Sequence, residues 1–587
     1  MKSIIPNDAV VIHDACQRSW LLFRYPRSVY SVNSISEIIP AIAAVEEEVM
    51  HQGAYAAGFI SYEAAPAFDP SLVTREHDAF PLLWFGIFDR PESISFPVIS
   101  DFSPDESLIW TPSVTRKQYR DAIDTIKGYI ASGDTYQVNY TFRMTAPFTK
   151  DPWDWFRVLV RAQNTPFGAF VNTDCWAVCS ASPELFFTRE GDRVISRPMK
   201  GTAPRGLMLS DDTAMAEWLF HSEKNRAENV MIVDMVRNDI GRIAKTGSVE
   251  VSDLFAIEKY PTIWQMTSTV SAQSTAGFGD ILCALFPPAS ITGAPKSRTM
   301  EIIAELETTP RRVYTGMVGF LSPGGNSQFN VAIRTVLIDK TKKLAEYGVG
   351  GGIVWDSDDS QEYEECRTKA KILTRQVPDF ELLETLRWTP GEDYFLLEYH
   401  MKRLMDSAAY FSFAVDPESV RDHLASLVPS FSGIPHRVRL TVADDGRITC
   451  QHRPLELPRT TRLYRVCLAK SPVDSSNPFL YHKTTNRSVY EEALAACPGY
   501  DDVILFNERG EITESCIANV VVERDGERWT PPVRCGLLPG TYRAFLIEQG
   551  MVKERVISKE DLTRNPHVSL INSVRKEWKI TFAREGS

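Results

Sequence analysis

The chain has 587 residues, enough for several domains with large hydrophobic cores. Apolar residues make up 43% and charged residues 24%, which is ordinary globular composition and excludes a disordered, collagen-like or fibrous chain. The 64 Lys and Arg against 76 Asp and Glu give a net charge of −12. This argues against nucleic acid or an anionic membrane as the main partner, although a pocket for a small anion can still be locally basic.

Cysteine usage and the N-terminus favour a reducing compartment. The ten cysteines are scattered and form no CxxC motif, so disulfide frameworks and zinc knuckles are not expected. The first residues carry one Lys, a broken apolar run and Asp8, which is unlike a signal peptide. The chain also lacks an apolar run of about 18 residues, the length that spans a membrane. We therefore expect a soluble, cytoplasmic protein.

The first half mixes amphipathic helices with strand-like runs. One apolar stripe predicts a helix over residues 117–132, and Gly133 is placed to end it. Residues 135–144 are rich in β-branched and aromatic side chains, which favours a strand. Residues 176–202 are typical of successive strands, with a turn at 190–192.

A glycine-rich apolar strand is predicted over residues 344–355. It leads into a helix over 356–376, which has Asp and Ser at its start and Lys and Arg toward its end. Two prolines and a glycine then fall within 376–392, where we place a linker.

We expect two domains, residues 1–375 and 393–587. The second opens with a predicted helix over 398–411, and strands follow over 436–451. No internal repeat or low-complexity tract is apparent.

Three carboxylates in the first domain are candidates for a metal site. Glu362 and Glu365 are three apart on the predicted helix and so lie on one face. Glu228 falls in another helical pattern. Together they could hold a hard cation through one or two oxygens plus water, the usual Mg²⁺ arrangement. A solvated helix face is the alternative for such a pair.

Lys200 is a candidate nucleophile. It is flanked by apolar strand residues and followed by Gly201, and a lysine desolvated in such a setting has a lowered pKa and a neutral, nucleophilic amine. A surface lysine in a turn is the alternative. Further along, Lys296 and Arg334 lie in stretches that also offer hydroxyls and backbone amides, a combination suited to binding carboxylates.

This half closely resembles the chorismate-utilising enzyme family over about residues 50–375. The matching stretches are SGDTYQVNYT, SASPELFF, RPMKGTAPRG, NRAENVMIVDMVRNDIGR, SITGAPKSRTMEII, GMVGF, NVAIRT and YGVGGGIVWDSD with EYEE. The resemblance implies an α+β fold, a sandwich of two large antiparallel sheets flanked by helices, that binds chorismate and Mg²⁺.

Within that family, anthranilate-forming members have Ala where this chain has Lys200, whereas members that make aminodeoxychorismate often have Lys. The resemblance implies that Lys200 attacks chorismate C2, that Glu184 protonates the departing C4 hydroxyl, and that ammonia enters at C4 as the lysine is expelled. It gives no catalytic role to Gln265, where relatives often have His. The implied Mg²⁺ ligands are Glu228 and Glu365 with Glu362 nearby, and the implied chorismate contacts are Thr292, Arg334, Tyr347, Gly348, Gly350 and Gly351.

The second domain carries Lys483 between an apolar strand and a polar turn, and Glu514 follows about thirty residues later. A surface salt bridge is the alternative interpretation of such a lysine and carboxylate. The order YHKTTNRSVY, GEITESCIANV, CGLLPGTYR nevertheless resembles fold-type IV pyridoxal-phosphate enzymes over about residues 393–587. Lys483 then matches the Schiff-base lysine and Glu514 the partner of the pyridinium nitrogen, while Arg403, Thr541 and Ser573 match phosphate-side contacts.

The fusion of the two halves implies a bifunctional route to p-aminobenzoate for folate. The first half would make 4-amino-4-deoxychorismate, and the second would remove pyruvate from it. Two alternatives stay open: an anthranilate-type synthase fused to a class IV aminotransferase, and a synthase with a non-catalytic C-terminal module. Lys200 speaks against the first alternative, and the retained Lys483 and Glu514 speak against the second.

The nitrogen source follows from what surrounds the cysteines. None of the ten lies in a G-x-C-x-G elbow, which a class I glutaminase needs for its nucleophile. The chain is therefore expected to use free ammonia or to take it from a separate glutamine amidotransferase subunit.

Overall fold

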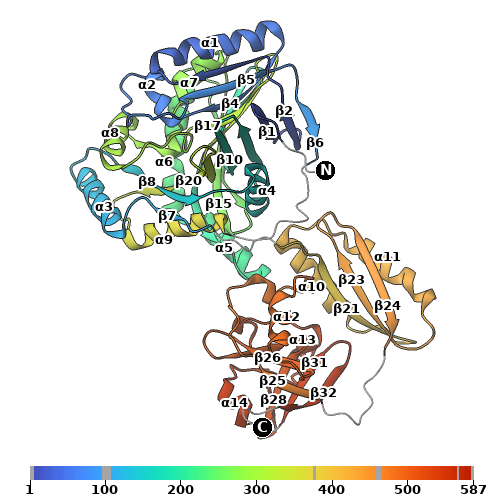
Figure 1. Ribbon diagram of the computed structural model, residues 1–587. Coiled ribbons are helices and arrows are strands. Elements are labelled where there is room, and N and C mark those ends of the chain that lie inside the picture. The colour runs from blue at the N-terminus through green and yellow to red at the C-terminus, as the bar shows by residue number, and fades with distance from the viewer. Residues whose placement is uncertain (1–4, 96–107, 375–377, 456–463, 565–566, 583–587) are drawn as a thin grey trace. The chain divides into compact units, whose positions relative to one another are not determined.

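The computed structural model describes residues 5–95, 108–374, 378–455, 464–564 and 567–582. The chain divides into two compact units (Figure 1). Unit 1 comprises residues 1–204 and 216–377, and unit 2 comprises residues 205–215 and 378–587. Unit 2 thus includes a short segment from the middle of the first half of the sequence.

The first sheet of unit 1 is antiparallel and ten-stranded over the described residues. In spatial order its strands are β16 (Gly293–Ala294), β8 (Gln137–Pro147), β20 (Leu344–Ile353), β19 (Thr335–Asp339), β10 (Trp176–Ser182), β9 (Phe167–Asn172), β1 (Ala9–Asp14), β2 (Ser19–Phe23) and β6 (Glu92–Ile94), with β7 (Thr111–Pro112) paired to β8.

The second sheet of unit 1 is likewise antiparallel and ten-stranded. Its order is β13 (Met199–Pro204), β15 (Ile263–Gln273), β12 (Arg193–Arg197), β11 (Leu185–Glu190), β18 (Ser327–Val331), β17 (Met317–Leu321), β4 (Tyr55–Ile60), β5 (Leu83–Phe88) and β3 (Ser28–Val32), with β14 (Glu250–Lys259) paired to β15.

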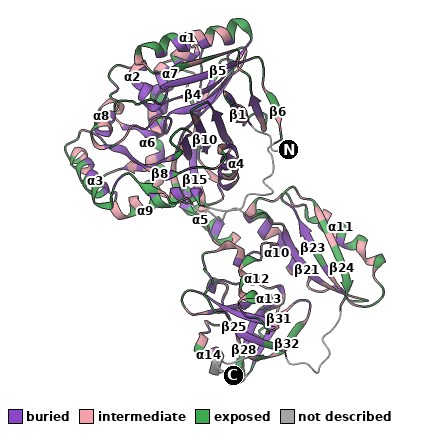
Figure 2. Cartoon of the chain, viewed as in Figure 1, coloured by how far each residue is buried: buried purple, intermediate pink, exposed green. Residues whose placement is uncertain are grey.

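The two sheets pack face to face, with helices outside. Along β1, Val10 and Ile12 enter an apolar cluster with Phe59 and Phe320 of the second sheet, whereas Val11 packs on the helix side. This alternation is the two-residue period of a strand. Figure 2 shows the strands largely buried. The helices are α1 (Ile35–Gln52), α2 (Ala65–Phe68), α3 (Arg116–Ala131), α4 (Pro152–Gln163), α6 (Glu223–Gly241), α7 (Phe278–Leu285), α8 (Lys296–Leu306) and α9 (Asp359–Ala370), while α5 (Leu209–His221) begins in unit 2 and ends in unit 1.

The predicted sandwich of two antiparallel sheets flanked by helices is confirmed. The helix predicted over 117–132 is α3 and the strand predicted over 135–144 is β8, whereas the helix predicted over 356–376 is the shorter α9, and residues 375 and 376 lie outside the described part. Helix α3 begins in a capping box in which Thr115 accepts from the Gln118 amide. The turn predicted at 190–192 contains Gly191, whose φ of 62° favours glycine. The glycine-rich strand is β20, and the helix after it starts at the cap Asp358, whose carboxylate accepts from two backbone amides.

Unit 2 contains two sheets. A small antiparallel sheet orders β22 (Asp393–Tyr394), β21 (Leu382–Thr389), β23 (His436–Val442) and β24 (Ile448–Pro454), and α10 (Leu397–Phe411) and α11 (Pro417–Leu427) pack with it. The larger sheet orders β27 (Ile512–Ser515), β26 (Asp502–Phe506), β25 (Tyr464–Leu468), β32 (Lys576–Phe582), β31 (Val568–Asn572), β28 (Asn519–Arg524), β29 (Glu527–Thr530) and β30 (Lys553–Glu554), and pairing of β27 with β28 closes it. Its helices are α12 (Ser488–Ala495), α13 (Thr541–Glu548) and α14 (Lys559–Arg564).

The linker predicted at 376–392 differs from the structure. Its residues 376 and 377 lie outside the described part, but residues 382–389 form β21, which pairs with β23 over residues 382–388. Leu382 and Leu386 are buried in the core of unit 2. The prolines and glycine that favoured a linker flank this strand instead of interrupting it, so regular structure begins earlier than residue 393.

Candidate active sites

Lys200 lies on β13 at the edge of the second sheet, and it is only partly exposed as a residue. The next residue, Gly201, has a φ of 91°, a conformation that favours glycine, and it bends the strand. The Asn229 side chain donates to the Lys200 carbonyl at 3.4 Å. This bond holds α6 next to Lys200. It also places Glu228, which precedes Asn229, near the lysine.

Lys200 and Glu184 influence each other's protonation. Burial lowers the pKa of Lys200, while Glu228 and Glu184 act against that shift. Burial also raises the pKa of Glu184 to about 7, although the Ser290 hydroxyl and Lys200 oppose it. An amine with a depressed pKa beside a carboxyl that is still partly protonated at neutral pH can attack an electrophile and protonate a leaving group.

The predicted Mg²⁺ carboxylates occupy different surroundings. Glu365 pairs with Lys369 at 2.7 Å, and this lysine lowers its pKa. Glu362 accepts from the Ser357 hydroxyl at 2.7 Å, and burial raises its pKa. No group of three or more His, Cys, Asp or Glu side chains suited to a metal occurs in the described chain. Mg²⁺ commonly takes one or two carboxylates plus water and substrate oxygens, and Glu228 with Glu365 offers that donor set.

Lys369 organises the predicted chorismate contacts, and our sequence reasoning missed it. Its Nζ donates to the Gly350 carbonyl at 2.8 Å. Its own carbonyl accepts from Arg334 at 3.0 Å and from the Tyr347 hydroxyl at 3.1 Å. The signal that could have revealed it is its position four residues after Glu365 on one helix face.

Gly352 is a second residue that the sequence did not single out. A Cβ added there would lie 2.1 Å from Nε2 of Gln137 and 2.9 Å from Nζ of Lys200. Gln137 is buried, and its Oε1 accepts no hydrogen bond from the residues that the structure describes. The space above Gly352 is therefore shared by the lysine amine and an unused amide oxygen. The predicted Gly351 is close by, since its Cβ would lie 3.3 Å from Oε2 of Glu362.

Gly352→Ala should strongly reduce any reaction at Lys200, because the methyl group occupies the space that the amine and Gln137 share. We expect a loss of about tenfold or more in the rate of the reaction at Lys200, while the activity of unit 2 stays unchanged. Gly128→Ala is the matched control, since a Cβ in that helix meets nothing within 4 Å. Equal rates for both variants would contradict this placement of Lys200.

The other predicted site residues of unit 1 are hydrogen-bonded or closely packed. Lys296, expected at the substrate, donates to Asp239 at 2.8 Å and to the carbonyls of Leu285 and Pro287. The Lys296 ammonium has three N–H donors, and these three contacts occupy them. The substrate contact expected of Lys296 therefore differs from its position in the structure. Thr292 is buried, and its hydroxyl donates to the Ala289 carbonyl at 3.2 Å. Gln265 donates from Nε2 to the Gly201 carbonyl at 2.8 Å. A Cβ on Gly348 would overlap the Tyr314 ring, and one on Gly350 the Tyr140 carbonyl.

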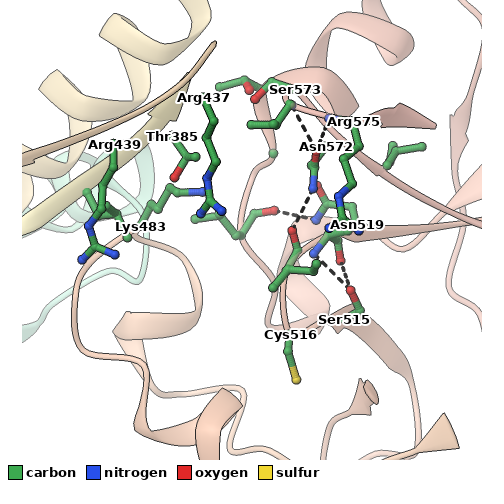
Figure 3. A pocket seen from close by; sticks show the side chains of 18 of the residues that line it. Thr385, Arg437, Arg439, Lys483, Ser515, Cys516, Asn519, Asn572, Ser573 and Arg575 are labelled. Carbon is green, nitrogen blue, oxygen red and sulfur yellow. Dashed lines mark hydrogen bonds between the residues drawn. The ribbon is translucent and has the colours of Figure 1, made fainter. Parts of the chain in front are cut away.

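Unit 2 contains a cavity of about 420 Å³ that gathers all the predicted cofactor residues (Figure 3). The described residues that line it include one carboxylate, Glu514. They also include the cations Arg403, Arg437, Arg439, Arg453, Lys483, Arg487 and Arg575, together with Thr541 and Ser573. The volume suits a small cofactor with a substrate, and the charge suits anions.

Lys483 is partly buried and Glu514 is buried, and both line this cavity. Burial lowers the pKa of Lys483 to about 7, and Arg403 acts in the same direction. The Lys483 carbonyl accepts from the Leu383 amide at 2.9 Å, which fixes the lysine beside β21. Glu514 accepts from the Tyr490 hydroxyl at 2.8 Å and the Leu538 amide at 3.1 Å, and burial raises its pKa to about 7.

The expected phosphate side is built around Arg403. Its guanidinium holds Glu384 through two bonds of 2.9 and 2.7 Å, and its Nη1 donates to the Pro539 carbonyl at 3.3 Å. Although burial acts to raise the pKa of Glu384, Arg403 and His400 hold it below its ordinary value. The Thr541 hydroxyl lies 3.3 Å from His400 Nε2. Arginine and hydroxyl donors at one end of the cavity, with Lys483 and the acceptor Glu514, fit the groups of pyridoxal phosphate.

The arginines of β23 and β24 were not singled out from the sequence. Arg437 and Arg439 alternate along β23 and so share one face, and Arg453 pairs with Arg437 across the sheet. Burial, together with the charges of Arg453, Arg439 and Arg575, lowers the pKa of Arg437. Figure 3 shows Arg437 and Arg439 at the cavity with Lys483. Such a cluster of cations favours an anionic ligand beyond a cofactor phosphate.

The matches to protein-family models divide the chain near residue 377, where the sequence also passes from unit 1 to unit 2. Residues 99–375 match the family model of chorismate binding enzymes, and residues 381–582 match that of amino-transferase class IV. The C-terminal part is therefore a class IV aminotransferase domain, a class that implies pyridoxal phosphate. None of the helices in the described residues has the length and apolar character needed to cross a bilayer.

Individual relatives match the first half. Aminodeoxychorismate synthase component 1 of Klebsiella aerogenes is 42% identical over 310 residues, which cover 52% of this chain and 66% of that protein. Anthranilate synthase component 1 3 of Haloarcula marismortui is 32% identical, over 55% of this chain and 73% of that protein. Among solved structures, anthranilate synthase component I from Streptococcus pneumoniae TIGR4 has a TM-score of 0.52 at 24% identity, covering 64% of this chain and 94% of that chain. The chain thus spans less than two thirds of the length of the aminodeoxychorismate synthase relatives that it matches, with 66% of the Klebsiella aerogenes protein and 59% of the Bacillus subtilis protein covered.

Proposed function

The chain belongs to the chorismate-binding enzyme family, and on that premise we propose that it makes p-aminobenzoate in two steps. Unit 1 aminates chorismate at C4 to give 4-amino-4-deoxychorismate. Unit 2 then eliminates pyruvate from that product. The observation that carries the first step is the Lys200 amine beside the raised-pKa Glu184. The observation that carries the second is the arginine-lined cavity around Lys483.

In the amination, the neutral Lys200 amine attacks C2 of chorismate. Both ring double bonds shift, and the C4 hydroxyl leaves with a proton from Glu184, so water departs. Ammonia then attacks C4, the double bonds shift back and the C2–N bond to Lys200 breaks. The proton that ammonia loses returns to the Glu184 carboxylate. Each cycle therefore exchanges hydroxyl for amine and restores both residues.

The anionic substrate needs positive partners in unit 1. Arg334 and the backbone of the Gly350 region are the proposed carboxylate contacts, positioned by Lys369. Glu228 and Glu365 would hold Mg²⁺, with Glu362 nearby. Mg²⁺ supplies positive charge against a chorismate carboxylate when bound. Without it, two carboxylates facing an anionic substrate would repel it.

In the elimination, Lys483 removes the C4 proton of aminodeoxychorismate. Pyridoxal phosphate, when bound, supplies an electron sink that makes this proton acidic. Glu514 would hold the ring nitrogen of the cofactor, while Arg403, Thr541 and Ser573 would bind its phosphate. Arg437 and Arg439 orient a substrate carboxylate. The enolpyruvyl group then leaves C3 as the enol, taking the proton back from Lys483, and it becomes pyruvate while the ring becomes aromatic.

Ammonia is proposed to come from a separate glutamine amidotransferase subunit. The matched synthase relatives carry the designation component 1. Free ammonium at high concentration should replace that subunit, because the amination itself needs only ammonia at C4.

One incubation tests the whole proposal: the purified chain with chorismate, Mg²⁺, pyridoxal phosphate and ammonium salt, followed by product identification. We expect p-aminobenzoate and pyruvate in equal amounts. Anthranilate would overturn the first half. Aminodeoxychorismate that accumulates without pyruvate would overturn the second, and amino transfer to a supplied oxo acid would point to a transaminase.

The pH dependence of cofactor loading tests the state of Lys483. The pKa of its buried amine is about 7, against about 10.4 for an ordinary lysine. The neutral, reactive form is the deprotonated one, so it dominates above the pKa. The rate at which cofactor-free chain gains visible absorbance on adding pyridoxal phosphate should rise as the pH rises through about 7 and then level off. A rate that climbs only near pH 10 would contradict this placement.

A further inference from the structure

Residues 205–212, which we call the strap, belong to unit 2 although they directly follow β13 with its Lys200. Arg205 binds Asp212 through two hydrogen bonds of 2.6 and 2.7 Å, and both side chains are buried. The Gly206 amide donates to the same carboxylate at 3.0 Å. A Cβ on Gly206 would lie 2.2 Å from the Asp212 amide, so this turn requires glycine. The strap is therefore a turn closed by hydrogen bonds that continues into the first residues of α5.

The strap is bonded to unit 2 at three consecutive residues. Arg205 donates to the Tyr410 carbonyl at 3.0 Å, and its guanidinium lies 4.6 Å from the centre of the Tyr410 ring. The Tyr410 hydroxyl donates to the Gly206 carbonyl at 2.8 Å. His482 Nε2 lies 3.1 Å from the Leu207 carbonyl. Leu207 and Met208 pack against the main hydrophobic core of unit 2.

His482 connects these bonds to the cavity. Its ring stacks on Tyr410 at a centroid distance of 4.3 Å, and its Nδ1 lies 3.0 Å from the Ser407 hydroxyl. Burial lowers the pKa of His482 to about 4, so the ring is neutral at pH 7. A carbonyl can only accept, which assigns the proton to Nε2 and leaves Nδ1 to accept from Ser407. The next residue in the chain is Lys483.

We propose that the surface formed by Tyr410, His482 and the adjoining core of unit 2 is a docking surface whose partner is the strap of this same chain. The docked strap holds the His482 side chain through the Leu207 carbonyl, and this contact keeps the neighbouring Lys483 in the cavity wall. The pyridoxal-phosphate half is then not a self-sufficient module, since it borrows the segment that follows the nucleophile of the first half. This inference rests on the proposed function only in taking pyridoxal phosphate as the ligand of the cavity.

The test uses the full-length chain loaded with pyridoxal phosphate. Tyr410→Phe removes one hydroxyl donor and keeps the ring, and Asp212→Asn weakens the loop closure at Arg205. Asp406→Asn is the matched control, because Asp406 lies on the same helix as Tyr410 in an exposed pair with Lys402. The two readouts are trypsin cleavage after Arg205, identified by fragment mass, and the rate at which cofactor is lost on dilution.

We expect both strap variants to be cut after Arg205 and to lose cofactor about tenfold faster than the parent, the effect that one buried hydrogen bond supports. The control should match the parent in both. Faster cleavage with parental cofactor retention would overturn the proposal, because the strap would dock without supporting the cavity. Parental behaviour of both variants in both readouts would overturn it as well. Thermal melts identify a variant that fails to fold. If Asp212→Asn fails to fold, the Tyr410→Phe result alone tests the proposal.

These outcomes are distinguishable from failure of the proposed function. Cofactor retention and cleavage are measured without substrate, so they report on the strap even in a chain that releases no pyruvate. Conversely, a parental chain that makes p-aminobenzoate but holds cofactor independently of the strap keeps the proposed function and loses this inference.

Discussion

Lys483→Ala should consume chorismate at the parental rate with Mg²⁺ and ammonia, but stop at 4-amino-4-deoxychorismate. Alanine can neither hold the cofactor nor remove the C4 proton, so p-aminobenzoate formation should fall on the order of 10³-fold or more. Product formation followed under single-turnover conditions is the decisive measurement. Lys470→Ala, at an exposed position of unit 2, is the matched control and should leave both steps unchanged.

A separate aminodeoxychorismate lyase added to the Lys483→Ala reaction should restore p-aminobenzoate. Because Lys483 and Lys200 belong to different compact units, this variant should keep its Mg²⁺ and ammonia dependence. Normal p-aminobenzoate formation by Lys483→Ala alone would mean that unit 2 is not the lyase, and the reading of unit 2 as a non-catalytic module would replace it.

Lys200→Ala should remove the C2 nucleophile and reduce amination at C4 on the order of 10³-fold. Direct attack of ammonia at C2 remains chemically open in this variant, so a trace of anthranilate-type product is expected. Release of pyruvate from supplied aminodeoxychorismate should stay at the parental rate. Lys342→Ala, an exposed lysine of unit 1, is the control. Aminodeoxychorismate formed at the parental rate by Lys200→Ala would exclude covalent catalysis by this residue.

Mixing the two variants reports on transfer of the intermediate. Lys200→Ala and Lys483→Ala together contain one intact copy of each site. Overall flux should recover if aminodeoxychorismate diffuses through solvent between chains. Little recovery, with each variant active in its own half-reaction, would mean that the intermediate passes within one chain.

Local patterns in the sequence predicted most of the fold. The strand over 135–144, the glycine-rich strand and the helices after Thr115 and Asp358 all appear in the structure, because alternation, caps and glycine placement act between near neighbours in the chain. The linker at 376–392 is where this reasoning failed. Proline and glycine mark the ends of β21 as readily as they mark a linker, and only its pairing with β23 distinguishes the two.

The candidate sites were predictable where a motif carries its own chemistry. Lys200, Glu184, Lys483 and Glu514 stand in short stretches whose order along the chain is enough to single them out. A short sequence motif does not determine whether such a side chain is buried or which protonation state it has. The depressed pKa of Lys483 comes chiefly from its burial in the folded cavity.

The sequence by itself thus determined the element types, the two halves and the motif residues, since these depend on local spacing. The tertiary structure decided which distant groups meet. It placed Gln137 and Gly352 beside Lys200, engaged Lys296 with Asp239, and joined Arg575 to the arginines of β23. It also assigned residues 205–215 to the second unit. The physical reason is that packing orients side chains through contacts between residues far apart in the chain. The local periodicity of the sequence does not predict those contacts.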